Sequence, residues 1–179
     1  LYGEGTEANP YIINNVSDLV YFRDSVNAGE TTYNAPGKWV ALGANIDLAG
    51  TTWARGIGDG INATFDGNFN GNGKTISNLN MAVKADSDAY LCGGLFGYTY
   101  GGVTITNLVL ENVTITSADE GHNVGILVGF ANNNGGKANI SDITVKGDIV
   151  VNTPNAYGVG AIVGYSYRAM GTIDNCQVI

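Results

Sequence analysis

Ile105-Thr106-Asn107-Leu108 is the clearest clue to the architecture of this chain, because the same four-residue pattern occurs three more times. The other copies are Ile76-Ser77-Asn78-Leu79, Ile140-Ser141-Asp142-Ile143 and Ile173-Asp174-Asn175-Cys176. Their isoleucines follow one another at steps of 29, 35 and 33 residues. A period of roughly 20–50 residues is typical of solenoids, in which each repeat is one unit that buries its inner face against its neighbours.

A glycine-rich pattern precedes three of these copies and repeats in step with them. It reads Gly93-Gly94-Leu95-Phe96-Gly97-Tyr98, Gly125-Ile126-Leu127-Val128-Gly129-Phe130 and Gly160-Ala161-Ile162-Val163-Gly164-Tyr165. Each period also holds short runs rich in Val, Ile and Thr, such as Val124–Phe130, Asn139–Val145 and Asp148–Val151. These runs are typical of strands, and the turns between them contain Asn-Gly-Gly and Lys-Gly. Three short strands in each period predict an all-β fold, a parallel β-helix.

The third position of the four-residue pattern is always Asn or Asp. Both residue types tolerate the left-handed backbone conformation and bond locally to the main chain, so they suit a point where a strand turns. Stacked on successive coils, their side chains can also bond one another along the axis. We therefore predict a structural ladder, and not an active site, formed by Asn78, Asn107, Asp142 and Asn175.

The glycine-rich strand has two faces, and alternation alone does not establish which one points into the core. One face collects Cys92/Val124/Val159, Phe96/Val128/Val163 and Tyr98/Phe130/Tyr165, and the other collects Leu95/Leu127/Ile162. We expect the first face to point inward because its side chains are bulkier. The opposite arrangement would place Tyr98, Phe130 and Tyr165 outside as a stripe.

The first 60 residues do not carry the repeat. Ser17 is followed by apolar residues at helical spacing and then by Gly29, which predicts one short helix with Ser17 as its N-cap. We assign this helix to capping the column, because the end coil of a solenoid would otherwise expose its core. The expected organisation is an N-terminal cap over residues 1–60, with a strand, the helix and the first coil, and β-helix repeats over 61–179 that are truncated at the C-terminus.

Several segments together resemble bacterial surface proteins with GLUG motifs. The segments are Gly3-Glu4-Gly5-Thr6, Asn9-Pro10-Tyr11-Ile12-Ile13, Ala44-Asn45-Ile46-Asp47-Leu48, the glycine-rich turn from Phe65 to Ile76, and the Gly-Leu-Phe-Gly, Leu-Val-Gly and Ile-Val-Gly runs. Such modules also occur outside the catalytic part of immunoglobulin-A-specific metallopeptidases. The resemblance implies a right-handed single-stranded parallel β-helix, a cell-surface or extracellular location and no settled activity.

Composition excludes several classes of partner. The chain has 16 acidic and 8 basic residues, a formal net charge of −8, so it repels nucleic acid and anionic lipid headgroups. No apolar run reaches the roughly 20 residues that a transmembrane helix needs. Cys92 and Cys176 match no metal-binding spacing, and the sequence leaves open whether they pair.

The sequence contains no residue pattern typical of a catalytic site, so we expect the chain not to be an enzyme. A polysaccharide lyase or glycoside hydrolase, the alternative on a β-helix scaffold, would need paired carboxylates or a basic cluster. The single histidine, His122, lies in a polar stretch and is expected to be solvated. No cofactor is expected, although Asp66-x-Asn68-x-Asn70-Gly71 fits the first half of a calcium loop and leaves a weak calcium site near Asp66 open.

The expected function is that of a non-catalytic module for adhesion or ligand presentation to a host protein or glycan, within a longer parent chain that has further domains. Stacked coils supply stiffness, and the loops at 82–90, 117–123, 131–138 and 152–157 supply variation. Aromatic side chains suit sugar rings, so the candidate glycan-binding residues are Tyr98, Tyr100, Phe130, Tyr165 and Tyr167.

Overall fold

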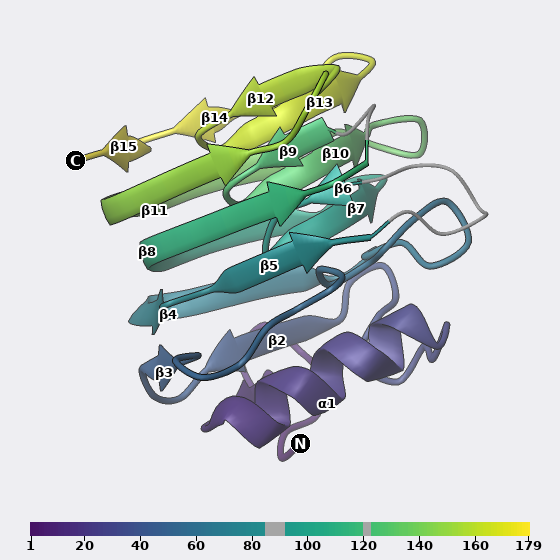
Figure 1. The fold of residues 1–179 in the computed structure, drawn as a ribbon. Coiled ribbons are helices and arrows are strands. Elements are labelled where there is room, and N and C mark those ends of the chain that lie inside the picture. Colours follow the sequence, from purple (N-terminus) through teal and green to yellow (C-terminus); the bar gives the residue numbers. More distant parts are fainter. Residues whose placement is uncertain (85–91, 120–122) are drawn as a thin grey trace.

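The chain forms a parallel β-helix of about four turns with a single short helix across one end (Figure 1). The computed structural model describes residues 1–84, 92–119 and 123–179. Strands on successive coils lie beside one another and pair in parallel, as the repeat predicts. The predicted β-helix with an N-terminal capping helix is therefore confirmed.

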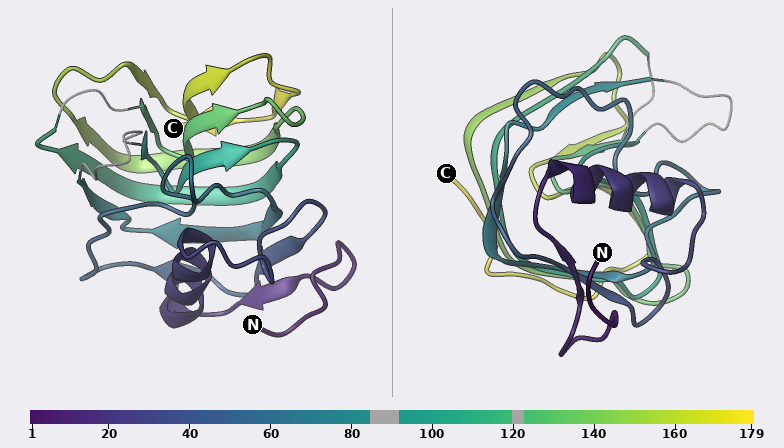
Figure 2. Two further views of the ribbon diagram at one scale, coloured as in Figure 1. Left: turned by 90° about the vertical axis from the view of Figure 1, so that its right-hand side faces the viewer. Right: turned by 90° about the horizontal axis from the view of Figure 1, so that it is seen from below.

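The largest sheet wraps around one side of the coil stack, in the order β1-β2-β4-β8-β11-β14 (Figure 2). Its members are β1 (Tyr11–Ile13), β2 (Trp39–Leu42), β4 (Asn68–Ser77), β8 (Thr104–Ser117), β11 (Asn139–Asn152) and β14 (Ile173–Asp174). Three shorter strands extend the same walls: β3 (Ile46–Asp47) pairs with β4, β5 (Asn80–Val83) with β8, and β15 (Gln177–Val178) with β11.

Two three-stranded sheets close the other side of the coils that carry the glycine-rich pattern. One contains β6 (Cys92–Gly93), β9 (Asn123–Gly125) and β12 (Gly158–Gly160), and the other contains β7 (Phe96–Tyr100), β10 (Val128–Asn132) and β13 (Val163–Tyr167). The predicted strand Val124–Phe130 is thus two strands, because the chain bends at Ile126 and Leu127. The predicted strands Asn139–Val145 and Asp148–Val151 are instead one bent strand, β11.

Pairing confirms most of the repeat register and corrects one copy. Ile105 lies beside Ile140, and Ile140 beside Ile173. Ile76 was expected to align with Ile105, but it pairs with Leu110. The register between β4 and β8 shifts between Asn70 and Lys74, where Gly71-Asn72-Gly73 adds residues to β4.

The helix α1 (Val16–Asn27) covers the first coil, as Figure 2 shows from below. Its N-cap is Asn15, whose side chain accepts a hydrogen bond from the Asp18 backbone N–H, so the predicted N-cap Ser17 is wrong. In return, Asp18 accepts a bond from the Asn14 backbone N–H at 2.9 Å, which satisfies a second donor at this end. The buried apolar residues of α1 are Leu19, Phe22 and Val26.

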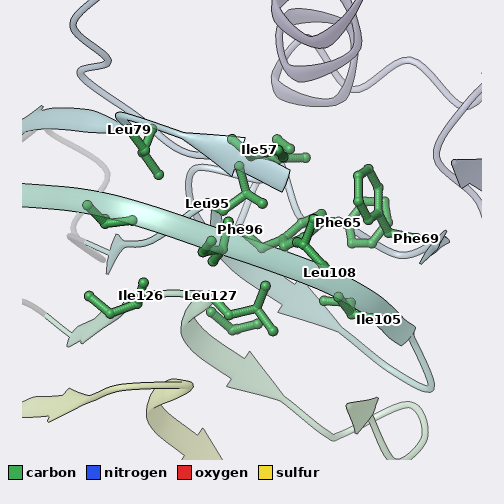
Figure 3. Packing of buried hydrophobic residues seen from close by; sticks show 14 of the residues in the cluster. Ile57, Phe65, Phe69, Leu79, Leu95, Phe96, Ile105, Leu108, Ile126 and Leu127 are labelled. Atoms are coloured by element: carbon green, nitrogen blue, oxygen red, sulfur yellow. The ribbon is translucent and has the colours of Figure 1, made fainter. Parts of the chain in front are cut away.

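Aromatic rings join the cap to the coils. Phe22 of the helix lies edge-on to Phe65, with 6.0 Å between ring centroids, and stacks on Phe69 at 6.4 Å. Phe96 on the next coil is 4.8 Å from Phe65 and 5.3 Å from Phe69 (Figure 3). Together with the stacked aliphatic residues these rings form one continuous core.

Candidate functional site

The tight turns that join β6 to β7, β9 to β10 and β12 to β13 shape the wall that carries the candidate glycan-binding residues. We name each of them a glycine hairpin. β9 and β10 approach so closely that a Cβ atom on Gly125 would lie 2.0 Å from the Val128 carbonyl oxygen. A Cβ on Gly164 would similarly lie 2.5 to 2.7 Å from three backbone atoms of Val124. Real Cβ atoms do not approach backbone so closely, so these positions require glycine. The repeated glycines therefore set the contact between the two short sheets.

Three aromatic rings form a column outside the main core, which we name the aromatic stack (Tyr98, Phe130 and Tyr165). Tyr98 and Phe130 stack with 4.7 Å between centroids and an interplanar angle of 7°. Phe130 and Tyr165 follow at 5.1 Å. Tyr98 and Phe130 cluster with Cys92 and apart from the main core, whereas Leu95, Phe96, Leu127 and Val128 belong to that core.

The expected orientation of the glycine-rich strand is therefore only partly right. Phe96 and Val128 point inward as expected, but Leu95 and Leu127 do so as well. These two leucines lie in the bends before β7 and β10, where the alternation of a strand is interrupted. Cys92 pairs with Asn123 and not with Val124, so the expected alignment of that column was wrong by one residue.

Exposure divides the five candidate aromatic residues into two groups. Tyr98 and Phe130 are 2% and 7% exposed and offer little surface to a ligand. Tyr100, Tyr165 and Tyr167 are 37%, 43% and 44% exposed. We name these three the tyrosine row. Tyr165 and Tyr167 belong to β13, on the last coil, while Tyr100 lies two coils away on β7.

Two residues beside the tyrosine row were not predicted from the sequence. Asn132 pairs with both Tyr100 and Tyr167 in the parallel sheet, and its amide donates a hydrogen bond to the Tyr98 hydroxyl at 2.9 Å. Arg168 places its guanidinium 5.6 Å from the centroid of the Tyr167 ring. Asn132 occupies the repeat position of the two tyrosines, so alignment of the coils could have found it.

The predicted asparagine ladder exists as two separate columns. In the first asparagine column (Asn70, Asn107, Asp142 and Asn175), Asn175 donates to the Asp142 carboxylate at 2.6 Å, and Asn107 donates to Asn70 at 3.4 Å. Asn107 and Asp142 occupy neighbouring positions of β8 and β11. Asn107, Asp142 and Asn175 have φ values of 55°, 56° and 47°, the left-handed conformation that was predicted.

Asn78 belongs to the second asparagine column (Asp47, Asn78 and Asn112), so its predicted stacking on Asn107 is wrong. Its amide donates to Asp47 at 2.7 Å and accepts from Asn112 at 3.4 Å. The cause is the extra length of β4, which moves Asn78 to the next corner of the coil. Asn112 also has a positive φ, of 55°, so β8 bends at two corners.

Hydrogen bonding along these columns lowers the pKa of two carboxyls. The Asn175 amide, with the Ser141 and Thr106 hydroxyls, holds the pKa of Asp142 below its ordinary value of 3.8. The Asn78 amide does the same for Asp47. A lowered pKa means that the ionised form stabilises the fold above pH 3.8, and that this stabilisation is lost as the pH falls through the lower folded pKa.

We expect Asn175→Gly to raise the pKa of Asp142 toward 3.8, because glycine keeps the left-handed backbone conformation and removes the donor amide. A carboxyl titration followed by NMR measures this pKa directly. Asp142→Asn should be less stable than the natural chain at neutral pH, and the difference should shrink below pH 3.8. An unchanged Asp142 titration in Asn175→Gly would contradict the role of the column.

The residues of the half calcium loop already have other partners. The Asn68 side-chain oxygen accepts from the Thr104 backbone N–H at 2.8 Å, and that of Asn70 accepts from the Asn72 backbone N–H at 2.8 Å. Thr64 donates to Asp66, whose pKa is raised by burial. Asn68 and Asn70 lie on β4, so this part of the motif is a strand and not a loop.

Two hollows lie on the outside of the described part of the chain. The first, of about 720 Å³, is lined by α1 and the segment 52–59, and includes Asp24 and Asp59. The second, of about 670 Å³, is lined by Asn78, Asn112, Asp148 and their neighbours. Asp24 pairs with Arg23 and Asp59 with Arg55.

His122 lies outside the described residues, as does most of the predicted loop 82–90.

The two cysteines do not form a disulfide with each other. Cys92 and Cys176 are both free, and burial raises the pKa of the Cys92 thiol to about 12, so this thiol is unreactive near neutral pH. Among the described residues, no helical segment has the length and apolar character needed to cross a bilayer.

Comparison with known proteins gives two sequence relatives and one structural neighbour. Halomucin of Haloquadratum walsbyi is 31% identical over 170 residues, which are 90% of this chain but 2% of that protein. A protein described as a Gly-rich membrane protein of Evansella cellulosilytica is 34% identical over 139 residues, 78% of this chain and 15% of its own length. This chain thus spans a small part of each relative. No family model matches it.

The structural neighbour shares the fold. It is a crystal structure assigned as an immunoglobulin A1 protease from Bacteroides ovatus, with a TM-score of 0.60 and 20% sequence identity. The superposition covers 98% of this chain and 58% of that one. The class defined by the fold is therefore that of capped parallel β-solenoids.

Proposed function

We propose that this chain is a non-catalytic module of a cell-surface or secreted protein of the GLUG-motif type, and that it presents side chains to a host protein or a glycan. The observation that carries the proposal is the tyrosine row. Three tyrosines, each more than a third exposed, project from one parallel sheet whose register is fixed coil by coil. Exposed aromatic rings on a rigid support suit both sugar rings and protein hot spots.

The relatives and the surface chemistry support this proposal. One relative is described as a membrane protein, and both relatives are much longer than this chain, as expected for a module of a large protein. The outward polar side chains of β8 and β11 bond one another across coils, as when the Thr106 and Ser141 hydroxyls meet at 2.9 Å. Such contacts stiffen the column.

The alternative is a polysaccharide-active enzyme on the same scaffold. Glycoside hydrolysis needs two carboxyl groups about 5–9.5 Å apart, one as the acid and the other as base or nucleophile. In the first hollow Asp24 and Asp59 are each paired with an arginine, and the second hollow contributes the single acid Asp148. We therefore favour binding over catalysis.

The test combines a binding screen with an activity assay. We expect the 179-residue chain to bind members of a glycan array or a panel of extracellular host proteins, and to release no reducing ends from polysaccharides. The variant Tyr100→Ser/Tyr165→Ser/Tyr167→Ser should lose at least about tenfold in affinity, since exposed aromatic anchors dominate such contacts. Tyr2→Ser, at a side chain 91% exposed near the other end, is the matched control.

Two results would contradict the proposal. Release of reducing ends in proportion to protein concentration would favour the enzyme. Binding that is equally strong in the triple variant and in the natural chain would remove the tyrosine row from the contact surface.

A further inference from the structure

The first hollow is a polar recess between the cap and the first coil, and hydrogen bonds and ion pairs hold its walls in place. Asn27 of α1 donates to the Gly56 carbonyl at 2.9 Å and accepts from the Gly58 backbone N–H at 2.8 Å, which fixes the helix to the opposite wall. Arg23 lies over the Trp53 ring at 4.5 Å and pairs with Asp24 at 2.7 Å. The walls of the recess are therefore held in place before any ligand arrives.

The second hollow adjoins the first, because Thr52 lines both. The Thr52 side chain is exposed. We refer to the two hollows together as the groove. Beyond Thr52 the lining consists mainly of hydroxyl and amide groups, including those of Asn80, Asn112 and Thr114. Asn112 is fixed by the second asparagine column, so this wall is also ordered.

The lining selects the chemistry of a ligand. Each hollow lies within the range of about 300–1,000 Å³ typical of small-ligand sites, but the polar lining disfavours an apolar ligand. Arg23 and Arg55 are balanced by Asp24 and Asp59, and Asp148 adds one more acid, so the groove gives no net attraction to an anion. Paired charges, amides and hydroxyls offer donors and acceptors side by side, as the hydroxyl groups of a sugar require.

We propose that this groove, which crosses from the cap to the first coils at Thr52, binds an uncharged oligosaccharide. The proposal rests on the proposed function, because it assigns that function a second contact surface and a ligand class. The guanidinium and carboxylate groups of the first hollow bond one part of the sugar chain. The amides and hydroxyls of the second hollow bond the part that runs along the coils.

Calorimetric titration of the whole 179-residue chain tests this assignment. The probes are neutral oligosaccharides (cellohexaose, mannohexaose and a neutral lactose-based tetrasaccharide) and acidic ones (sialyllactose and trigalacturonate). We expect the neutral probes to bind and the acidic probes to bind more weakly. Thr52→Tyr fills the junction and should weaken neutral binding at least about tenfold, which corresponds to about 1.4 kcal/mol.

Thr31→Tyr is the matched control, because Thr31 is also exposed and lines neither hollow. Its binding should equal that of the natural chain, and both variants should keep the same unfolding midpoint. The inference is overturned if no neutral probe binds, if acidic probes bind better, or if Thr52→Tyr binds as well as Thr31→Tyr.

The tyrosine-row variant separates this inference from the proposed function. Neutral sugar binding that survives in Thr52→Tyr but disappears in Tyr100→Ser/Tyr165→Ser/Tyr167→Ser would overturn the groove and support the tyrosine row. The reverse result would support the groove as the sugar site. Capture of a host protein through the tyrosine row, with no sugar bound anywhere, would overturn the groove and leave the proposed function standing.

Discussion

Replacing Gly125 by alanine is expected to lower the free energy of unfolding by about 3 kcal/mol, at the upper end of the usual cost of overpacking. The new Cβ atom would lie 2.0 Å from the Val128 carbonyl oxygen and 2.6 Å from the Gly164 backbone nitrogen. Both obstacles are backbone, so no side-chain rotation relieves them. The hairpin would have to open, and it would separate β9 from β10 and from the next coil.

Gly60→Ala is the matched control for Gly125→Ala. A Cβ atom on Gly60 would meet nothing within 4 Å, and the backbone there needs no positive φ. We expect a change within about 0.5 kcal/mol, as for other substitutions on open surface. Urea unfolding monitored by circular dichroism measures both variants. Equal stability of the two would show that the strands do not approach as closely as the glycine hairpin requires.

Phe96→Ala is expected to cost about 3–5 kcal/mol, the range for removing a large aromatic side chain from a core. Phe96 is fully buried and contacts the rings of both Phe65 and Phe69, which in turn carry Phe22 of the capping helix. Its removal leaves a cavity where the cap meets the coils. The cap should therefore loosen together with the second coil, and not as a separate unit.

Hydrogen exchange and urea unfolding together measure that loss. Faster exchange of amides in α1 and β4 of Phe96→Ala is the expected signature of a shared core. Tyr2→Ala, at a residue that is 91% exposed, should change stability by less than about 0.5 kcal/mol. A Phe96→Ala variant as stable as Tyr2→Ala would contradict the packing of the cap on the coils.

The repeat made the solenoid predictable from sequence, because three of the four copies take equivalent positions on neighbouring coils. Ile105, Ile140 and Ile173 stack as expected, and Asn107 and Asp142 turn the chain with left-handed backbone angles. The copy at Ile76 was misaligned, because the extra residues of Gly71-Asn72-Gly73 in β4 cannot be told from an ordinary glycine-rich turn by sequence.

The candidate site was less predictable than the fold. Alternation implies one inward face, but the glycine hairpin brings both Leu95 and Phe96 into the core and leaves Tyr98 in an outer stack. The groove at Thr52 is lined partly by a segment outside the repeat, so the repeat pattern does not predict it. Its lining depends on contacts between residues far apart in the sequence, such as Asn27 and Gly58, which are separated by 31 positions.

The central claim is that the chain winds about one axis with β8 directly beside β11. The hydroxyls of Thr106 and Ser141 are 2.9 Å apart on these strands, and neighbouring strands lie about 4.8 Å apart, which suits a disulfide. Thr144 lies three positions further along β11, where it pairs with Val109. That offset is about 10 Å, too far for a bridge.

Oxidative cross-linking of paired cysteines is the most direct measurement. In a background with Cys92→Ala and Cys176→Ala, the pair Thr106→Cys/Ser141→Cys should form an intramolecular disulfide rapidly, detected by mass spectrometry of peptides. The pair Thr106→Cys/Thr144→Cys should remain reduced under the same conditions. Efficient bridging of the second pair, or none of the first, would contradict the coil register on which the stack, the columns and the groove depend.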